Sequence, residues 1–548
     1  MKKNLKTILA LTLCLVLALG LLAGCGGSGT SSSGSTSGST SSSGASAAST
    51  GSDSSAAAEV SDGSDVTLRY VCHAPNTVTN FTSDPAVDYT ALINQGNGTC
   101  ETLMVLDDDT KEVKPLLATA WEQTDDTTWV ITIRDGVKFS NGKDLNAEAV
   151  VAAFTYILEN NTRLATMLKV DELIADGQTL TIKTTANVAI LPRILTEQNM
   201  LVFDTDDDNY ADGLVGTGPY ILESMDADGN CDLVRNDNYW QGVPAAGKIH
   251  TIPIKNTTAI SNALQAGEID WGTVADSDLE IFENDPRYEV MTKNNGRVYY
   301  LYVNPNYTFT QDDAVREALQ YAFDRDSIVA GVYSGRGEST YSIFPTWSEF
   351  YTADHLQPAY NAETAKKILA DAGYADTDGD GFLDKDGEKV TLSIYTYGTN
   401  NFPVLCEVLQ SMLKAIGIDS NIVISTQIFD DLTGGQYNIG TYGYNTLTLG
   451  DSFNYMQPVF ETGASSNFTK FSNAEVDAAL AEMSVTADPA RRAELVRQMQ
   501  GPIYASNERI YLMHILNNQV NVAGVENLPV LFGGDNTDNS VLWTITKK

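Results

Sequence analysis

Histidine, cysteine and basic residues are scarce in this chain of 548 residues, and each shortage excludes a class of function. The four histidines and six cysteines are too scattered to bind a bare soft or borderline metal ion, which prefers imidazole or thiolate ligands. Lysine and arginine number 34 against 71 acidic residues, so the formal net charge is -37. Such an acidic surface repels phosphate backbones, which excludes nucleic acid as a partner.

Common catalytic motifs are also absent beyond the N-terminal segment. No Gly-x-Ser-x-Gly, no His-Glu-x-x-His and no Gly-x-x-x-x-Gly-Lys-Ser/Thr occurs there, and the isolated histidines suggest no pair of nucleophile and base. An enzyme such as an anchored hydrolase is therefore a weaker hypothesis than a binding protein. We expect no catalytic residue and no required cofactor. Without an ATP-binding loop, any transport would need ATPase subunits supplied by other chains.

Long apolar runs are missing except for one, from Ile8 to Leu22, which follows three lysines. A basic start, a short apolar stretch and small residues before a cleavage site describe a secretory signal over residues 1–24. The Leu-Ala-Gly-Cys sequence that ends at Cys25 resembles the bacterial lipobox, whose cysteine receives a diacylglycerol. We expect a lipidated Cys25 that anchors the protein at the extracellular face of the bacterial cell membrane. The alternative is a chance cysteine at an ordinary cleavage site.

The residues after the signal indicate a flexible tether followed by a large body. Residues 25–64 are mostly serine, glycine, threonine and alanine, a composition that cannot form a core. The body that follows is too long for one ordinary domain, which favours two or more lobes. It contains four cysteines, which either form two disulfides outside the cell or remain buried thiols. These are Cys72, Cys100, Cys231 and Cys406.

Periodic patterns predict interleaved strands and helices. Val66–Val71 alternates as a first strand, and Trp129–Arg134 with Val137–Phe139 is expected to form a hairpin around the Asp-Gly pair between them. Asn146 is expected to cap a helix. Later helices are predicted at Val315–Phe323, Ala362–Ala372 and Leu405–Ile416, and strands at Val298–Asn304, Val390–Thr396, Ile418–Ile424, Ile439–Tyr444 and Ile510–Ile515. Strands and helices in mixed order, without an internal sequence repeat, indicate a multi-lobed α/β fold.

Five sequence blocks occur in a familiar order. They are Trp129–Gly142, Val215–Tyr220, Arg235–Trp240, Leu264–Asp270 and Val315–Asp324. Together they resemble the peptide- and nickel-type family of extracellular solute-binding proteins that feed ABC importers. The resemblance implies capture of a short peptide or peptide-like solute, with the importer's permease and ATPase as partners and a monomeric protein. A sensor receptor that presents the solute elsewhere is a further alternative.

The same resemblance implies a two-lobed, periplasmic-binding-protein-like fold of type II, with an extra subdomain inserted in the first lobe. Lobe I is expected over residues 65–302, including the inserted subdomain at about 106–213. Lobe II is expected over 303–518, and 519–548 returns to lobe I. The crossings are placed near Val298–Asn304 and Tyr511–Val522. Ligand would lie between the lobes, where closure removes it from water.

In peptide-binding relatives, an aspartate three residues after an aromatic pairs with the ligand's amino terminus. Tyr444 resembles that aromatic, but Leu447 stands three residues on, and Asp451 is the nearby carboxylate. Asp451 either anchors a ligand amine or caps a turn. The ligand-binding candidates of this segment are Tyr442, Tyr444, Asn445, Thr446 and Asp451.

A metal chelate is the alternative ligand, because the helix end at Asn160–Arg163 resembles that of nickel-type relatives. There an arginine at the place of Arg163 helps to hold a carboxylate-rich chelate. Gln198 stands where a second arginine is expected, and the direct histidine ligand near Phe460–Phe468 is missing. Arg163 is otherwise a helix-end arginine that interacts with the carbonyl ends.

An acidic loop has the spacing of a calcium site. Oxygen donors would come from loop positions one, three, five, seven and nine, with a glycine at six. The expected ligands are Asp376, Asp378, Asp380, the carbonyl of Phe382, and Asp384. Position twelve is Gly387, and a strand follows instead of a helix. The loop is therefore either a structural Ca²⁺ site or a plain Asp/Gly turn.

Overall fold

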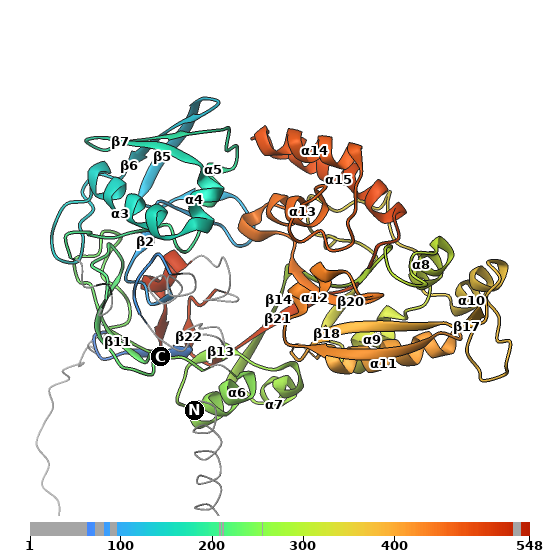
Figure 1. Cartoon of the computed structure of the whole chain (residues 1–548). Coiled ribbons are helices and arrows are strands. Elements are labelled where there is room, and N and C mark those ends of the chain that lie inside the picture. Colours follow the sequence, from blue (N-terminus) through green and yellow to red (C-terminus); the bar gives the residue numbers. More distant parts are fainter. Residues whose placement is uncertain are drawn as a thin grey trace, which may run out of the picture. The chain divides into compact units, whose positions relative to one another are not determined.

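A computed structural model describes residues 63–71, 82–87, 96–207, 210, 213–254, 256–399, 401–529 and 539–548 (Figure 1). The chain divides into two units, Met1–Val60 and Ser61–Lys548, and the described residues belong to the second unit. The predicted signal, Cys25, nearly all of the tether and Cys72 lie outside them. None of the helices within the described ranges has the length and apolar character needed to cross a membrane.

Strands and helices alternate along this unit. The strands are β1 (Thr67–Val71), β2 (Glu101–Thr102), β3 (Met104–Leu106), β4 (Val113–Pro115), β5 (Ala118–Asp125), β6 (Thr128–Ile133), β7 (Val170–Asp176), β8 (Thr179–Thr184), β9 (Leu201–Val202), β10 (Tyr220–Met225), β11 (Cys231–Arg235), β12 (Lys248–Ile252), β13 (Trp271–Thr273), β14 (Tyr288–Val303), β15 (Gly337–Ser339), β16 (Asp384–Lys385), β17 (Glu388–Lys389), β18 (Thr391–Tyr397), β19 (Asp419–Ser425), β20 (Ile439–Asn445), β21 (Arg509–Val522), β22 (Val525–Glu526) and β23 (Thr546–Lys547). The α-helices are α3 (Ala147–Asn160), α4 (Thr162–Leu168), α5 (Leu191–Ile194), α6 (Thr257–Ala266), α7 (Leu279–Glu283), α8 (Asp313–Gln320), α9 (Arg325–Val332), α10 (Ala362–Asp371), α11 (Phe402–Ala415), α12 (Ile428–Gly434), α13 (Phe453–Phe460), α14 (Ala474–Val485) and α15 (Pro489–Ala505).

An eleven-stranded sheet forms the centre, in the order β10-β11-β12-β1-β13-β21-β14-β20-β18-β19, with β15 attached to β21. The long strands β14 and β21 lie side by side and antiparallel, and they join the first part of this sheet to the second (Figure 1). Tyr288–Asn294 pairs with the end of β21, whereas Val298–Val303 pairs with both β21 and β20. The two segments predicted as crossings lie in this pair of strands.

Side chains of β14 alternate between two cores, as the pleat of a strand requires. Leu301 and Val303 pack in one cluster with α8 and α11. Tyr300 and Tyr302 point to the opposite face and pack with α13 and α15. A third hydrophobic cluster contains buried side chains from the segment between Cys100 and Leu214. The central sheet therefore supports packed layers on both faces.

Most predicted elements are confirmed, but the hairpin after Trp129 is wrong. Strand β6 pairs with β5 and β8 instead of with Val137–Phe139. That segment turns back at Asn141 and Gly142, where the Phe139 N–H donates to the Lys143 carbonyl at 2.9 Å. Gly136 and Gly142 both have a positive φ, of 78° and 88°, so both pairs form turns. The hairpin fails because the buried apolar face of β6 finds two longer partner strands in β5 and β8.

Helix signals in the sequence are reliable in this protein. The Asn146 side chain accepts a hydrogen bond from the Ala149 N–H at 2.9 Å and caps α3 as predicted. Helix α11 ends before Gly417, whose φ is 83°. The cysteines Cys100, Cys231 and Cys406 are buried free thiols.

Candidate functional site

A cavity of about 290 Å³ lies between two distant segments of the chain. One wall comes from the segment predicted as the inserted subdomain, and the other from the segment predicted as lobe II. We name it the charged cavity. Its lining consists of Glu112, Val113, Trp121, Trp129, Ala189, Ile190, Pro192, Arg193, Glu349, Phe350, Asp451, Ala487, Pro489 and Arg492. A neighbouring cavity of about 350 Å³ shares Ala189, Ile190 and Arg492 with it.

Arg193, in the short helix α5, joins both walls of the charged cavity. Its Nη1 donates to the Lys111 carbonyl at 2.7 Å and to the Leu449 carbonyl at 3.0 Å. Gly450 allows this approach, because a Cβ there would lie 2.7 Å from that Nη1, and its φ of 67° also favours glycine. Burial lowers the pKa of Arg193, and the charge of Asp451 opposes that shift.

Asp451 and Arg492 form a buried ion pair. Arg492 donates from Nε to Asp451 Oδ2 at 2.8 Å and from Nη2 to Oδ1 at 2.7 Å, and each side chain is 4% exposed. Arg492 Nη1 also donates to two backbone carbonyls, those of Met483 and Thr486. Asp451 Oδ1 further accepts the Phe453 N–H at 2.8 Å. Asp451 is therefore charge-balanced within the protein, and its bond to the Phe453 N–H is a contact of the turn-capping kind.

The other candidates of that segment lie in or beside β20. The Thr446 hydroxyl is buried and donates to the Gly296 carbonyl at 2.8 Å. Asn445 Oδ1 accepts the Leu447 N–H at 3.0 Å. The half-buried Tyr442 and Tyr444 pack their rings together, with centroids 6.3 Å apart. None of these four residues is among those that line the two cavities.

Arg163 lies in the first turn of α4 and is 41% exposed. Its Nη1 contacts Glu197 Oε1 at 2.5 Å, and its Nη2 donates to Asn199 Oδ1 at 3.3 Å. It does not line either cavity. Helix α3 ends at Asn160 and α4 begins at Thr162, so Arg163 follows the carbonyl end of one helix and lies in the first turn of the next.

Two residues that the sequence analysis did not single out as ligand contacts, the exposed Glu349 and the buried Trp129, also line the charged cavity. The carboxylate of Glu349 has no hydrogen bond or ion pair within that part of the chain, and burial raises its pKa while Arg193 opposes the rise. The buried Trp129 Nε1 has no acceptor there either. Trp129 belongs to a sequence block noted above, but nothing in the sequence pairs it with Glu349.

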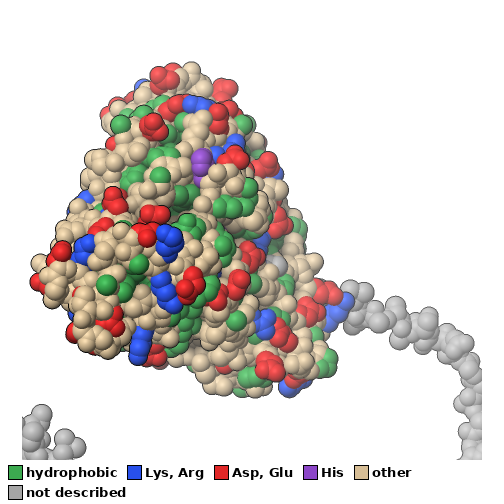
Figure 2. Space-filling model, turned by 90° about the vertical axis from the view of Figure 1, so that its right-hand side faces the viewer, with side chains coloured by type: hydrophobic (Ala, Val, Ile, Leu, Met, Phe, Trp, Pro, Cys, Tyr) green, Lys and Arg blue, Asp and Glu red, His purple; other side chains and the backbone are tan. Residues whose placement is uncertain are grey.

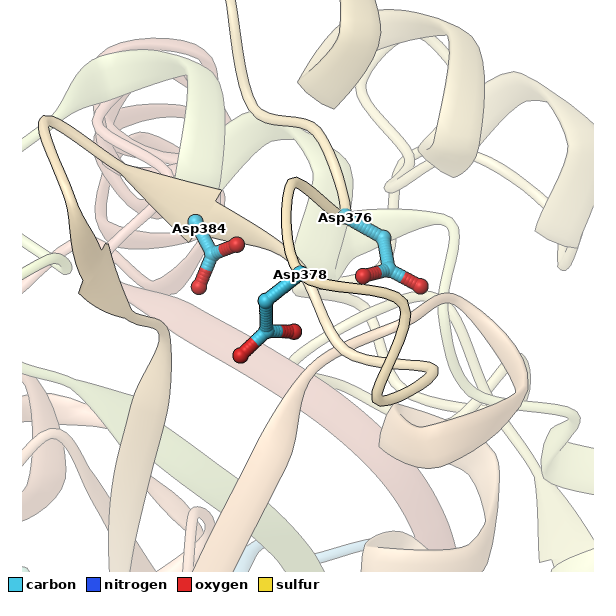
Figure 3. Close-up of side chains that lie close together, drawn as sticks. All are labelled: Asp376, Asp378 and Asp384. Atoms are coloured by element: carbon cyan, nitrogen blue, oxygen red, sulfur yellow. The ribbon is translucent and has the colours of Figure 1, made fainter.

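The acidic loop brings three of its predicted ligands together. Oxygen atoms of Asp376, Asp378 and Asp384 lie within 4.8 Å of one another (Figure 3). Asp384 begins β16 and accepts the Thr377 N–H at 2.9 Å, while the other two carboxylates come from the preceding loop. Asp380 is not in this group.

Asp380 and Phe382 have other contacts in the same loop. Asp380 Oδ2 lies 3.4 Å from Lys389 Nζ, and that same Nζ lies 4.5 Å from the centroid of the Phe382 ring. The three remaining carboxylates accept hydrogen bonds from the loop itself, which a plain turn also requires. Calcium binding therefore stays a prediction.

The face shown in Figure 2 carries acidic and basic side chains interspersed with apolar ones. Acidic side chains lie beside the basic ones on that face, in keeping with the excess of acidic residues over the whole chain.

Comparisons with known proteins give one consistent result. The sequence model described as bacterial extracellular solute-binding proteins, family 5 Middle, matches residues 112–467. The oligopeptide-binding protein AppA of Bacillus subtilis (strain 168) is 26% identical over 549 residues, which cover 95% of this chain and 95% of that relative. The nickel-binding protein NikA of Staphylococcus aureus (strain NCTC 8325 / PS 47) is 27% identical over 403 residues, which cover 72% of this chain and 79% of that relative. The crystal structure of a nickel ABC transporter protein from Bacillus halodurans has a TM-score of 0.74 and 26% identity, and the match covers 86% of this chain and 98% of that one.

Proposed function

The chain belongs to the bacterial extracellular solute-binding proteins of family 5, which serve ABC importers, and from this premise we propose that its solute is a short peptide or a peptide-like small molecule. The family assignment confirms the predicted resemblance and the α/β fold of the type II periplasmic-binding-protein kind. Because its relatives are substrate-binding proteins, the chain is a binding protein and not an enzyme. An ABC permease is the partner that the family implies.

The charged cavity is the observation that carries the proposal. It combines two tryptophans and a phenylalanine with two arginines and three carboxylates, a mixture suited to a solute with apolar and charged parts. Its volume of about 290 Å³ lies at the low end of ligand pockets, which span roughly 300–1,000 Å³, and favours a small solute.

A nickel or other metal chelate is the second candidate, because nickel-binding relatives match as well as peptide-binding ones. Arg163, the residue expected to hold such a chelate, contacts Glu197 and lies outside both described cavities. That position favours the peptide-like solute over the chelate. A sensor receptor is less favoured.

Anchoring and assembly form part of the same proposal. A diacylglycerol on Cys25 would hold the protein to the extracellular face of the membrane, with residues 25–64 as a flexible tether and a monomeric body. Cys25→Ser should move the protein from the membrane fraction to the medium without lowering its melting temperature. Retention of that variant in the membrane fraction would contradict lipidation.

Mass spectrometry of small molecules released from gently purified protein tests the solute. We expect one dominant peptide or peptide-like compound that raises the melting temperature when it is added back to the stripped protein. A released metal chelate would establish the second candidate instead. A protein that binds neither class would contradict capture at the charged cavity.

A further inference from the structure

A larger cavity, of about 570 Å³, lies on the other face of β14 from the charged cavity. We name it the rear cavity. Tyr299 lines it and packs with Leu301 in the cluster beside α11, whereas Phe350 of the charged cavity packs in the cluster beside α13. These clusters cover opposite faces of β14, and the two cavities share no lining residue. The rear cavity is therefore separate from the proposed solute site.

Segments that precede and follow β14 in the sequence form the walls of the rear cavity. One wall consists of residues 273–277 at the end of β13, and the other comes from the connection between α9 and β15. Between them, β14 and β21 contribute Tyr299, Asn517 and Asn518. The volume lies within the range of roughly 300–1,000 Å³ that ligand pockets span. It is large enough for a small organic molecule.

Two charged side chains line the rear cavity, and only one of them has an ionic partner among the described residues. Arg336 Nη2 lies 2.7 Å from Glu283 Oε1, so a residue outside the lining balances its charge. The half-buried Asp276 accepts a hydrogen bond from Asn518 Nδ2 at 2.5 Å. Burial raises the pKa of Asp276, while Asn518 and the more distant Arg336 oppose the rise. The rear cavity therefore carries one negative charge that no ion pair within those residues compensates.

Two tyrosines of the lining lie near this carboxylate. Burial raises the pKa of Tyr299 and of Tyr333, and the charge of Asp276 adds to both shifts, which indicates that all three side chains are close together. The centroids of the two rings lie 5.8 Å apart. The face of a tyrosine ring attracts a cation, and carboxylate and hydroxyl oxygens accept hydrogen bonds from an ammonium group.

The charge of the lining selects a class of ligand. An anion would face the Asp276 carboxylate, and a neutral molecule would leave its charge unbalanced. A hard metal ion such as Ca²⁺ takes roughly six to eight oxygen ligands, and Asp276 is the one carboxylate of the lining. We infer that the rear cavity binds a small organic amine in its ammonium form, with Asp276 as the ionic partner and Tyr299 and Tyr333 beside it. This second site goes beyond the proposed solute capture and does not depend on it.

Isothermal titration calorimetry with ethanolamine and 1,4-diaminobutane at neutral pH tests this site. Ethylene glycol and acetate are the neutral and anionic controls. The parent protein should form a saturable complex with the amines and with neither control. Asp276→Asn keeps an oxygen acceptor for Asn518 but removes the charge, so amine binding should weaken at least about tenfold.

A matched variant separates the site from general attraction of amines to this acidic chain. Glu280→Gln changes an exposed carboxylate of α7 that lies outside the lining, and it should bind like the parent. Both variants change the net charge equally, so a difference between them isolates the contribution of Asp276.

Arg336→Gln gives a test in the opposite direction. The change removes the one cation of the lining and leaves Glu283 without its ionic partner, so amine binding should become tighter. Thermal melts verify that each variant folds, and the half-buried Arg336 provides a result even where Asp276→Asn is unstable.

Three results would overturn the assignment. A parent protein without saturable amine binding would remove the site. Equal losses in Asp276→Asn and Glu280→Gln would reduce the binding to surface attraction. Acetate binding by the parent that Arg336→Gln abolishes would show that the rear cavity takes an anion instead. Each of these results leaves the solute of the charged cavity unaffected, because the copurified compound tests that solute separately.

Discussion

Asp451 and Glu101 are two buried carboxylates that the protein stabilises in opposite ways. Asp451 has an arginine against both oxygens. Glu101, in β2, instead accepts hydrogen bonds from Tyr239 Oη at 2.7 Å, Thr217 Oγ1 at 2.8 Å and Trp240 Nε1 at 3.0 Å. Burial raises the pKa of Glu101 to about 7 in spite of these donors.

The difference shows that the protonation state of a buried acidic side chain depends on the groups that contact it. A cation in direct contact keeps a buried carboxylate charged, whereas neutral donors leave the protonated form favourable. Asp451 has its charge matched by Arg492 at the wall of the charged cavity. Glu101 should exchange a proton near neutral pH. Four predictions test this contrast, in order of decreasing effect.

Removing Arg492 from its pair with Asp451 should lower the free energy of unfolding more than any other change considered. Arg492→Met leaves the buried Asp451 uncompensated, and breaking such a pair typically costs about 3–5 kcal/mol. Urea unfolding of the two proteins measures the loss. The double variant Asp451→Asn with Arg492→Met should recover a substantial part of it, because no buried charge remains. A loss below about 1 kcal/mol in the single variant would contradict the pairing.

Glu101 should make stability fall as the pH rises. Its pKa is raised from 4.5 to about 7 by burial, so its contribution is fully present below about pH 4.5 and is lost as the pH rises to about 7. The loss corresponds to roughly 3 kcal/mol. Glu101→Gln keeps an oxygen acceptor but cannot ionise, so it should equal the parent at pH 4.5 and exceed it in stability at pH 8.

Urea unfolding of the parent and of Glu101→Gln at several pH values measures this difference in stability. The exposed Glu223→Gln is the matched control, since it removes an acidic group without removing a buried one. Parallel stability curves for parent and Glu101→Gln would show that Glu101 ionises normally.

A shared metal ion would be a third way to offset carboxylate charge, at the two exposed and one buried carboxylates of the acidic loop. If Ca²⁺ binds Asp376, Asp378 and Asp384, a concentration ten times the Kd stabilises the fold by about 1.4 kcal/mol. Thermal melts with Ca²⁺ and with EDTA measure this effect. Asp378→Ala should abolish it, whereas Asp380→Asn should not, because Asp380 lies outside the group of three. No difference between Ca²⁺ and EDTA would leave a plain turn.

A surface ion pair should have the smallest effect. Arg163→Ala removes the contact to Glu197, and such exposed pairs contribute about 0–1 kcal/mol. Urea unfolding should detect little change, and retention of the copurified solute should stay the same. A large loss of solute binding would restore Arg163 as a ligand contact and favour the chelate.

The sequence predicted helix caps and helix ends because each of these features depends on residues only a few positions apart. Asn146 caps α3 through its own side chain, and Gly417 ends the region of α11 through a positive φ. Apolar alternation predicted β14, β18, β20 and β21, since the pleat sorts neighbouring side chains onto opposite faces. The choice of strand partners was less certain, and the hairpin after Trp129 failed because β6 found partners outside the adjacent segment.

Residue type and short spacing were enough to predict the family resemblance, the acidic character and the position of most elements. Which charged side chains meet could be seen only in the folded protein. It placed Arg492 against Asp451, and it set Arg193 and Glu349 on a common cavity without contact. Separation along the chain hides these relations, because the charge state and partner of a buried side chain depend on what the folded walls bring near it.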